Sequence, residues 1–116
     1  MGDDLWLLDT GATGHCTDDP RSLENYAECS RVLRCAGGNS FPIVGTGTLR
    51  LSLRSGEGVV CVTLINVAHV PDLSHHLLSL RRIADAGNKY IGTREGIRIV
   101  FAKSGDELFA PSRGQL

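Results

Sequence analysis

The 116-residue sequence is poor in several features that would indicate a particular class of protein. Aromatic residues make up only 5% of the chain, and 12 Lys and Arg residues are balanced by 13 Asp and Glu residues. A strongly basic surface with interleaved aromatic residues, typical of nucleic-acid-binding domains, is therefore not expected. No apolar run approaches the roughly 20 residues that a membrane-spanning helix needs. We expect neither nucleic acid nor a membrane as a partner, and no signal peptide.

Cysteine is also sparse, and its spacing does not indicate a metal site. The four cysteines, at positions 16, 29, 35 and 61, form no C-x-x-C pair. A zinc site combining His15 and Cys16 with another cysteine has no support from the spacing. We expect the cysteines to be free thiols that pack as small apolar groups. This implies a reducing, intracellular location in the cytoplasm. No metal and no cofactor are expected.

Glycine is abundant, with 14 residues, and it separates many short apolar runs. This pattern favours a single, mainly β domain over residues 1–116. Strands are expected at residues 5–9, 31–36, 41–53, 59–70, 89–92, 97–102 and 106–109. Residues 15–28 are mostly polar and are expected to form a loop with one helical turn near Leu23.

One short helix is predicted near the C-terminal end, over residues 74–86. Asp72 or Ser74 can cap its start, and Gly87 suits the position just after its end. An apolar stripe at helical spacing would face the core, while Arg81 and Arg82 would face solvent. The stripe consists of Leu77, Leu80, Ile83 and Ala84.

The most informative segment is the apolar run that leads into Asp9-Thr10-Gly11. Aspartic proteases present a catalytic carboxylate in this way, at the end of a buried strand and before a sharp turn. Their chemistry needs two adjacent carboxylates, one protonated and one ionised. Because the chain contains the triplet once, it predicts a homodimer with a single active site on the two-fold axis. The alternative is an ordinary strand-terminating turn in which Asp9 bonds to its own backbone.

In such a dimer the two Asp9 carboxyl groups would share one proton over a broad pH range. The ionised group would activate a water, and the protonated group would donate to the scissile carbonyl. Thr10 hydroxyls could bond across the two-fold axis. Gly11, followed by the small Ala12, would leave room for substrate backbone.

Three segments resemble the protease region of Ty1/copia-type retrotransposon Gag-Pol polyproteins, a retropepsin-type aspartic protease. Residues 6–15, Trp-Leu-Leu-Asp-Thr-Gly-Ala-Thr-Gly-His, resemble the start of that region. Residues 66–73, Asn-Val-Ala-His-Val-Pro-Asp-Leu, and residues 77–80, Leu-Leu-Ser-Leu, resemble two later segments. The resemblance covers nearly the whole chain.

The resemblance implies a fold and a set of site residues. The fold would be a retropepsin-like closed β-barrel with one short C-terminal helix, acting as a homodimer. Asp9 would be the catalytic residue, within the triplet completed by Thr10 and Gly11. A flap hairpin over about residues 32–50 would close on the substrate through Gly37, Gly38 and Asn39. The residues expected to contact substrate are Leu7, Ala12, Gly37, Gly38, Asn39, Val70, Pro71 and Leu73.

The activity implied is that of an endopeptidase that processes its own polyprotein, inside a virus-like particle if the element is active. The partners would be a second copy of the chain and a peptide substrate. An alternative is a dimerisation or binding module that has kept the fold and lost catalysis. A third interpretation is an unrelated β-barrel binding domain.

Several details remain open at the level of sequence. Gly45-Thr46-Gly47 is a rival flap tip, although we place it in the returning strand, where glycine permits close backbone approach. His15 is expected to brace the loop after Asp9, without a catalytic role. Because only eight residues precede Asp9, we expect residues Lys89 to Phe109 to supply the dimer interface.

Overall fold

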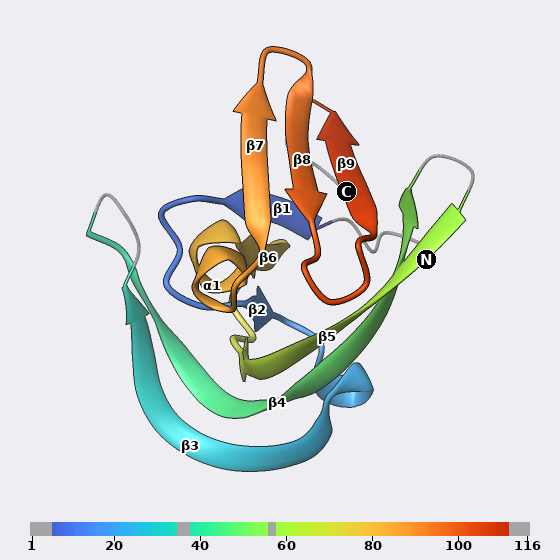
Figure 1. Cartoon of the computed structure of the whole chain (residues 1–116). Coiled ribbons are helices and arrows are strands. Elements are labelled where there is room, and N and C mark those ends of the chain that lie inside the picture. Colours follow the sequence, from blue (N-terminus) through green and yellow to red (C-terminus); the bar gives the residue numbers. More distant parts are fainter. Residues whose placement is uncertain (1–5, 35–37, 56–57, 112–116) are drawn as a thin grey trace.

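The computed structural model describes residues 6–34, 38–55 and 58–111 (Figure 1). Its fold is mainly β with one short helix, which confirms the fold class expected from the sequence at that level. The larger of two sheets contains β1 (Trp6–Asp9), β2 (Cys16–Thr17), β3 (Glu24–Arg34), β4 (Ser40–Ser55), β5 (Gly58–His69) and β6 (His76–Ser79).

The order of strands in the larger sheet is β1-β6-β2-β5-β4-β3. β1 and β6 pair in parallel, although they are far apart in sequence, and β2 links them to the antiparallel β3–β4–β5 meander. The meander curls strongly, so that the sheet forms half of a barrel around β1, β2 and β6 (Figure 1).

Local irregularities explain the curl of the meander. The pairing of β3 with β4 shifts register after Glu24 and after Glu28, and the pairing of β4 with β5 shifts between Gly47 and Leu49. Asn25 and Asn66 adopt left-handed backbone conformations, with φ of 54° and 57°. Such bulges bend a strand and increase its twist.

Gly45 and Gly47 lie inside β4, as expected for the returning strand of the hairpin. A Cβ atom at Gly45 would collide with the Tyr26 ring, and one at Gly47 would lie 2.9 Å from the carbonyl oxygen of Glu24. Both glycines therefore allow β3 to pack closely across β4, which confirms the close backbone approach expected here.

A second, three-stranded sheet follows the helix. It contains β7 (Lys89–Thr93), β8 (Gly96–Val100) and β9 (Glu107–Pro111), joined as an antiparallel meander. The strands expected between residues 89 and 109 are thus confirmed. Ile99 and Leu108 are fully buried beneath this sheet, and they attach it to the main core.

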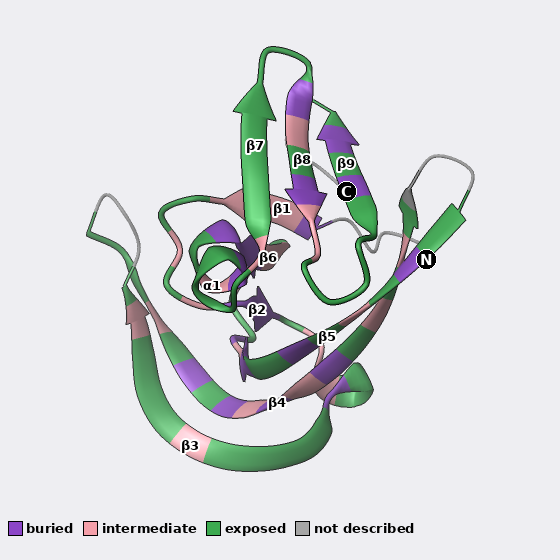
Figure 2. Ribbon diagram, viewed as in Figure 1, coloured by how far each residue is buried: buried purple, intermediate pink, exposed green. Residues whose placement is uncertain are grey.

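Two apolar clusters hold the domain together (Figure 2). The larger one joins the strands of the half-barrel to helix α1 (Leu80–Asp85) and to the small sheet, and it includes Trp6, Leu78 and Leu80. The smaller one lies on the concave side of the meander and centres on Cys16, Ile43, Ala68 and Val70.

The helix expected over residues 74–86 is wrong in its first half. Residues 76–79 form β6, and α1 begins only at Leu80, with Ser79 as its cap in place of Asp72 or Ser74. The physical reason is long-range pairing: Leu77 and Leu78 align with Leu7 and Leu8 of β1, which local helical spacing cannot reveal. The stop at Gly87 is confirmed, since its φ of +96° lies in the left-handed region after the helix.

The loop expected over residues 15–28 is wrong at both ends. Cys16–Thr17 form β2, and β3 begins at Glu24. Residues Glu24 to Glu28 are all exposed, so no apolar alternation marks them as a strand. They form a strand, interrupted by a bulge at Asn25, because β4 offers backbone hydrogen bonds. The helical turn expected near Leu23 is confirmed as a 3-10 helix at Pro20–Ser22.

Cys29 and Cys61 carry free thiols. Cys16 is buried and Cys29 half-buried, both at the smaller cluster, as expected for small apolar groups. Cys61 is exposed, and Cys35 lies outside the described residues. Within residues 6–34, 38–55 and 58–111, no helix is long and apolar enough to cross a membrane.

Replacing Gly96 by Ala should destabilise the domain. Gly96 has a φ of +153°, and an added Cβ would collide with the carbonyl oxygen of Ala110 in β9. We expect a loss of roughly 1 to 3 kcal/mol in the free energy of unfolding, measured by thermal or urea denaturation. Gly92→Ala is the matched control, because an added Cβ there meets no atom within 4 Å. Equal stability of the two variants would contradict the prediction.

Candidate active site

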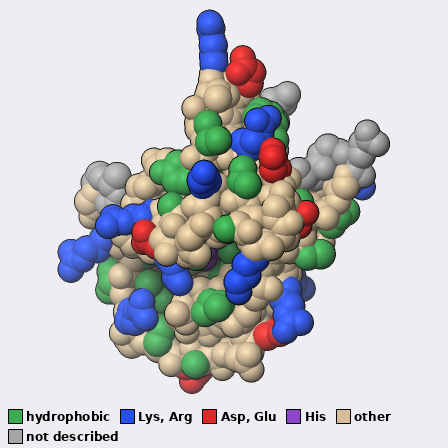
Figure 3. All heavy atoms as spheres, viewed as in Figure 1, with side chains coloured by type: hydrophobic (Ala, Val, Ile, Leu, Met, Phe, Trp, Pro, Cys, Tyr) green, Lys and Arg blue, Asp and Glu red, His purple; other side chains and the backbone are tan. Residues whose placement is uncertain are grey.

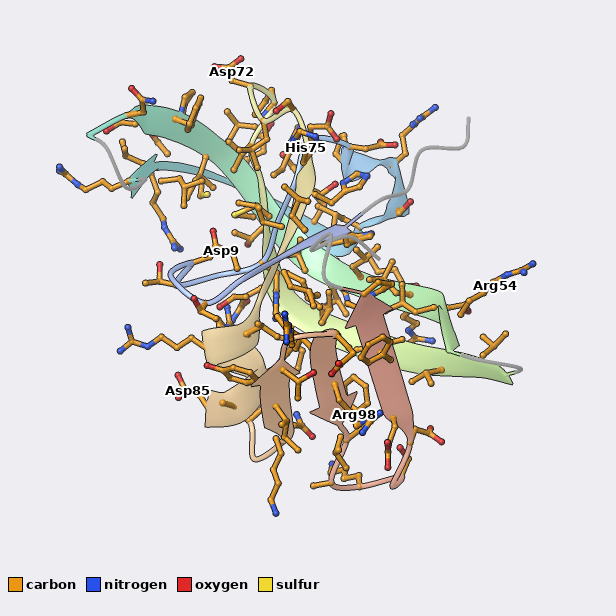
Figure 4. All side chains as sticks on the ribbon, turned by 90° about the horizontal axis from the view of Figure 1, so that it is seen from above. Asp9, Arg54, Asp72, His75, Asp85 and Arg98 are labelled. Atoms are coloured by element: carbon orange, nitrogen blue, oxygen red, sulfur yellow. The ribbon has the colours of Figure 1, made fainter. Side chains whose placement is uncertain are left out.

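Asp9 is the last residue of β1, and its side chain is half-buried. Its Oδ1 accepts a hydrogen bond of 2.7 Å from the backbone N–H of Gly11. The carboxylate is therefore held over the turn that follows it (Figure 4). An ordinary Asp turn would contain this bond as well, so the surroundings of the turn must distinguish the two interpretations.

The strand that carries Asp9 is fixed by parallel pairing with β6. Leu7 and Leu8 lie opposite Leu77 and Leu78, and Asp9 lies opposite Ser79. Trp6 stacks on the ring of His76, with ring centroids 4.7 Å apart. Both strands are short, with four residues each, and the stacked rings together with the buried Leu78 fix their register.

Ser79 connects the loop after Asp9 to the start of α1. The residue is fully buried, and its Oγ donates a hydrogen bond of 2.6 Å to the carbonyl oxygen of Ala12. The same Oγ accepts from the backbone N–H of Arg82 at 3.1 Å, and so caps the helix. A single hydroxyl thus fastens the loop at its third residue past the carboxylate.

His15 fastens the other end of the same loop. It is buried, with 4% of its surface exposed, and its Nδ1 accepts a hydrogen bond of 3.0 Å from the backbone N–H of Ser79. The backbone carbonyl of His15 accepts from the N–H of Ala68 at 2.9 Å. The expectation that His15 braces the loop is confirmed. Burial, and secondly the charge of Arg82, lower its pKa to about 4.

Arg82 does not face solvent as the helical pattern suggested. Its side chain is partly buried, and its Nη2 donates a hydrogen bond of 3.3 Å to the carbonyl oxygen of Ile65. The guanidinium lies beside Gly14, where an added Cβ would be 4.0 Å from Nη1. Arg81, by contrast, is exposed as expected.

The start of the loop after Asp9 differs from its braced end, because Thr10 and Gly11 are exposed.

A cleft of about 530 Å³ lies next to the braced loop. Thr13 and Gly14 form one side, the outer half of β3 forms the other, and residues of β4 and β5 form the floor. Figure 3 shows Lys and Arg side chains around this part of the surface, beside the β3–β4 hairpin. The hairpin expected over residues 32–50 is therefore present and borders the cleft, and its role as a flap stays a prediction.

The residues expected to contact substrate lie in different environments. Leu7, Ala12 and Leu73 are half-buried, Pro71 is exposed, and Val70 is fully buried in the smaller cluster. Gly38, with a φ of +89°, and Asn39 are exposed near the hairpin tip. Gly37 lies outside the described residues. Their roles in substrate binding remain predictions.

Two features of the site were missed from the sequence. Ser79 was placed inside a helix, although a serine just before an apolar helical run is a typical cap. Arg31 and Arg34 were not singled out, because only the fold brings them to the same cleft as Arg82. Among the described residues, no group of His, Cys, Asp and Glu side chains is suited to hold a metal ion.

Acidification should destabilise the fold through His15. Because its folded pKa is lowered, the unfolded chain binds the proton first, and stability is lost as pH falls from about 6.5 to about 4. We expect a loss of roughly 1 to 3 kcal/mol over this window, measured by urea denaturation at a series of pH values. His15→Asn, which keeps an acceptor near Nδ1 without titrating there, should remove this loss. The exposed control His75→Asn should retain it.

Comparison with known proteins identifies the family. Residues 6–88 match the model of the Pol polyprotein β-barrel domain. The chain is 30% identical over 117 aligned positions to the retrovirus-related Pol polyprotein from transposon RE1 of Arabidopsis thaliana, and 28% identical to that from transposon RE2. In each comparison 90% of this chain aligns with 8% of the longer polyprotein. The chain therefore belongs to the family of Pol polyprotein β-barrel domains and is related to the polyproteins of plant retrotransposons.

Proposed function

We propose that this domain is one half of an aspartic endopeptidase that cleaves the retrotransposon polyprotein. The observation that carries the proposal is Asp9, held at the end of the partly buried strand β1 by a hydrogen bond from Gly11, on a turn that Ser79 fastens from the core side. Catalysis gains from a carboxylate whose position is fixed before substrate binds. The relationship to retrotransposon Pol polyproteins supports a role in polyprotein processing.

The finer fold assignment belongs to the same proposal. The curled β3–β4–β5 meander would supply one side of the closed barrel of acid proteases, and β1, β2 and β6 would complete it. The hairpin joining β3 to β4 would act as the flap. Leu7, Ala12, Pro71 and Leu73 would line pockets for apolar residues of the substrate, above the buried Val70.

A second copy would supply the second carboxylate. With two Asp9 groups side by side, one proton is shared because two adjacent negative charges are costly. The ionised carboxylate takes a proton from water as that water attacks the scissile carbonyl. The other carboxyl group donates its proton to the carbonyl oxygen. Exposed Thr10 and Gly11 suit this arrangement, since both would meet their counterparts at the two-fold axis.

The small sheet is the proposed dimer interface. Among the described strands, β7 pairs only with β8 and so forms the edge of the small sheet, and all five of its residues are exposed. Ile91 lies opposite Arg98, which in turn lies opposite Phe109. Ile91 and Phe109 are 50% and 38% exposed, which is unusual for large apolar residues on a small domain. An edge strand beside two exposed apolar side chains, one on each side of Arg98, is suited to pairing with a second copy.

Replacing Asp9 by Asn should abolish processing of a longer precursor that contains this domain. The amide cannot act as a general base, so the cleavage rate should fall at least roughly 100-fold. The rate is measured by gel analysis of the precursor at mildly acidic and neutral pH. Asp85→Asn, an exposed carboxylate on α1 (Figure 4), is the matched control and should leave cleavage unchanged. Undiminished cleavage by Asp9→Asn would favour a binding or dimerisation module without catalysis.

Replacing Ile91 by Lys should weaken the dimer. A second positive charge beside Arg98, in place of an exposed apolar side chain, would raise the dissociation constant roughly 10-fold or more, measured by sedimentation. Val59→Lys is the matched control, because Val59 is 63% exposed on β5, outside the small sheet. Substitution is preferable to deleting residues 89–109, since Ile99 and Leu108 belong to the core. An unchanged dimer in Ile91→Lys would contradict this interface.

A further inference from the structure

The cleft beside the Asp9 loop has a charge of one sign. Its charged lining residues are three arginines, Arg31, Arg34 and Arg82, and its lining contains no Asp or Glu within the described part of the chain. The fourth titratable group, His15, is kept neutral by burial at physiological pH. The cleft is therefore basic, although the whole chain has a formal net charge of −1.

The arginines come from both walls of the cleft. Arg82 belongs to α1, on the side of the braced loop, and its guanidinium is anchored by the carbonyl oxygen of Ile65. Arg31 and Arg34 belong to the outer half of β3, on the side of the hairpin. Both are exposed. The pairing of this stretch of β3 is regular, so Arg31 shares a face with Ile43 on the cleft floor, whereas Arg34 projects from the opposite face and lies at the edge of the cleft.

Within the described part of the chain, no carboxylate pairs with these charges. In the described ranges, the ion pairs involve Arg21, Arg50, Arg98 and His76, and none of the three cleft arginines bonds to a carboxylate. Each guanidinium offers several donors in a planar arrangement that matches a carboxylate. A ligand that crosses the cleft between the two walls would meet positive charge on both sides.

We infer that this cleft binds acidic side chains of the substrate, so that the enzyme prefers polyprotein segments with Asp or Glu near the cut. The inference deepens the proposed function and rests on it for the identity of the ligand as a peptide. Asp9 is not among the residues lining the cleft. The acidic residues are therefore expected at some distance from the scissile bond, while apolar residues flank the bond itself.

A peptide is favoured over nucleic acid by the shape and surroundings of the cleft. The floor is formed by apolar and small residues of the smaller cluster, including Ile43 and Ala68, which suit a peptide's side chains. Aromatic residues on which bases could stack are absent from its described lining. The exposed β3 edge beside it offers backbone hydrogen bonds to an extended peptide.

The test compares two short synthetic peptides that differ only in charge. One carries glutamates on both sides of a central apolar pair, and the other carries glutamines at those positions. Binding is measured by fluorescence anisotropy with the wild type and with Asp9→Asn, which separates binding from cleavage. We expect the glutamate peptide to bind roughly 5-fold tighter at low salt, with the preference disappearing at high salt.

Variants of the cleft decide where the preference originates. Arg31→Gln combined with Arg34→Gln should remove most of the preference, and folding is not at risk because both side chains are exposed. Arg54→Gln is the matched control: Arg54 lies on the opposite side of the molecule from Asp9 (Figure 4) and should leave the preference unchanged.

Three results would overturn the inference. The first is equal binding of the two peptides. The second is the same loss of preference in Arg54→Gln as in the double variant. The third is tighter binding of a single-stranded oligonucleotide that depends on Arg31 and Arg34. A different result would separate the two proposals. If the glutamate peptide is still preferred and Asp9→Asn still cleaves its precursor, the cleft assignment stands and the proposed aspartic protease is rejected.

Discussion

The parallel pairing of β1 with β6 is the constraint on which the candidate site depends. It aligns Asp9 with Ser79. In this position Ser79 can donate a hydrogen bond to Ala12, which is 67 positions away in sequence. Only in this register can one buried hydroxyl both hold the loop and cap α1. A shift by one residue would turn Leu78 out of the core and move Ser79 away from the loop.

The loop after Asp9 is rigid on one side and open on the other. Ser79 and His15 hold it from the core side with short hydrogen bonds, and the burial of His15 keeps its ring neutral and able to accept. Thr10 and Gly11 face outward without such cover. This asymmetry is consistent with a site that is completed by another surface, because a carboxylate on a fixed turn can meet a partner without reorganising.

The curled meander determines what surrounds this turn. Bulges and close glycine contacts bend β3 and β4 around the central strands, which leaves a cleft between the hairpin and α1. The same bend brings arginines from β3 opposite Arg82. The catalytic and substrate-selecting parts of the proposed enzyme therefore come from different elements: the turn from β1 and β6, the charged walls from the meander and the helix.

The sequence alone determined the features that depend on local chemistry. The apolar run before Asp9, the glycine-rich turns and the stop at Gly87 reflect side-chain burial and backbone freedom, which neighbouring residues set. Tertiary structure decided the rest. Residues 76–79 have helical spacing but form a strand because β1 supplies hydrogen bonds, and the exposed residues 24–28 join β3 because β4 does. The meeting of Arg31, Arg34 and Arg82 likewise depends on contacts between elements distant in sequence, which no local pattern encodes.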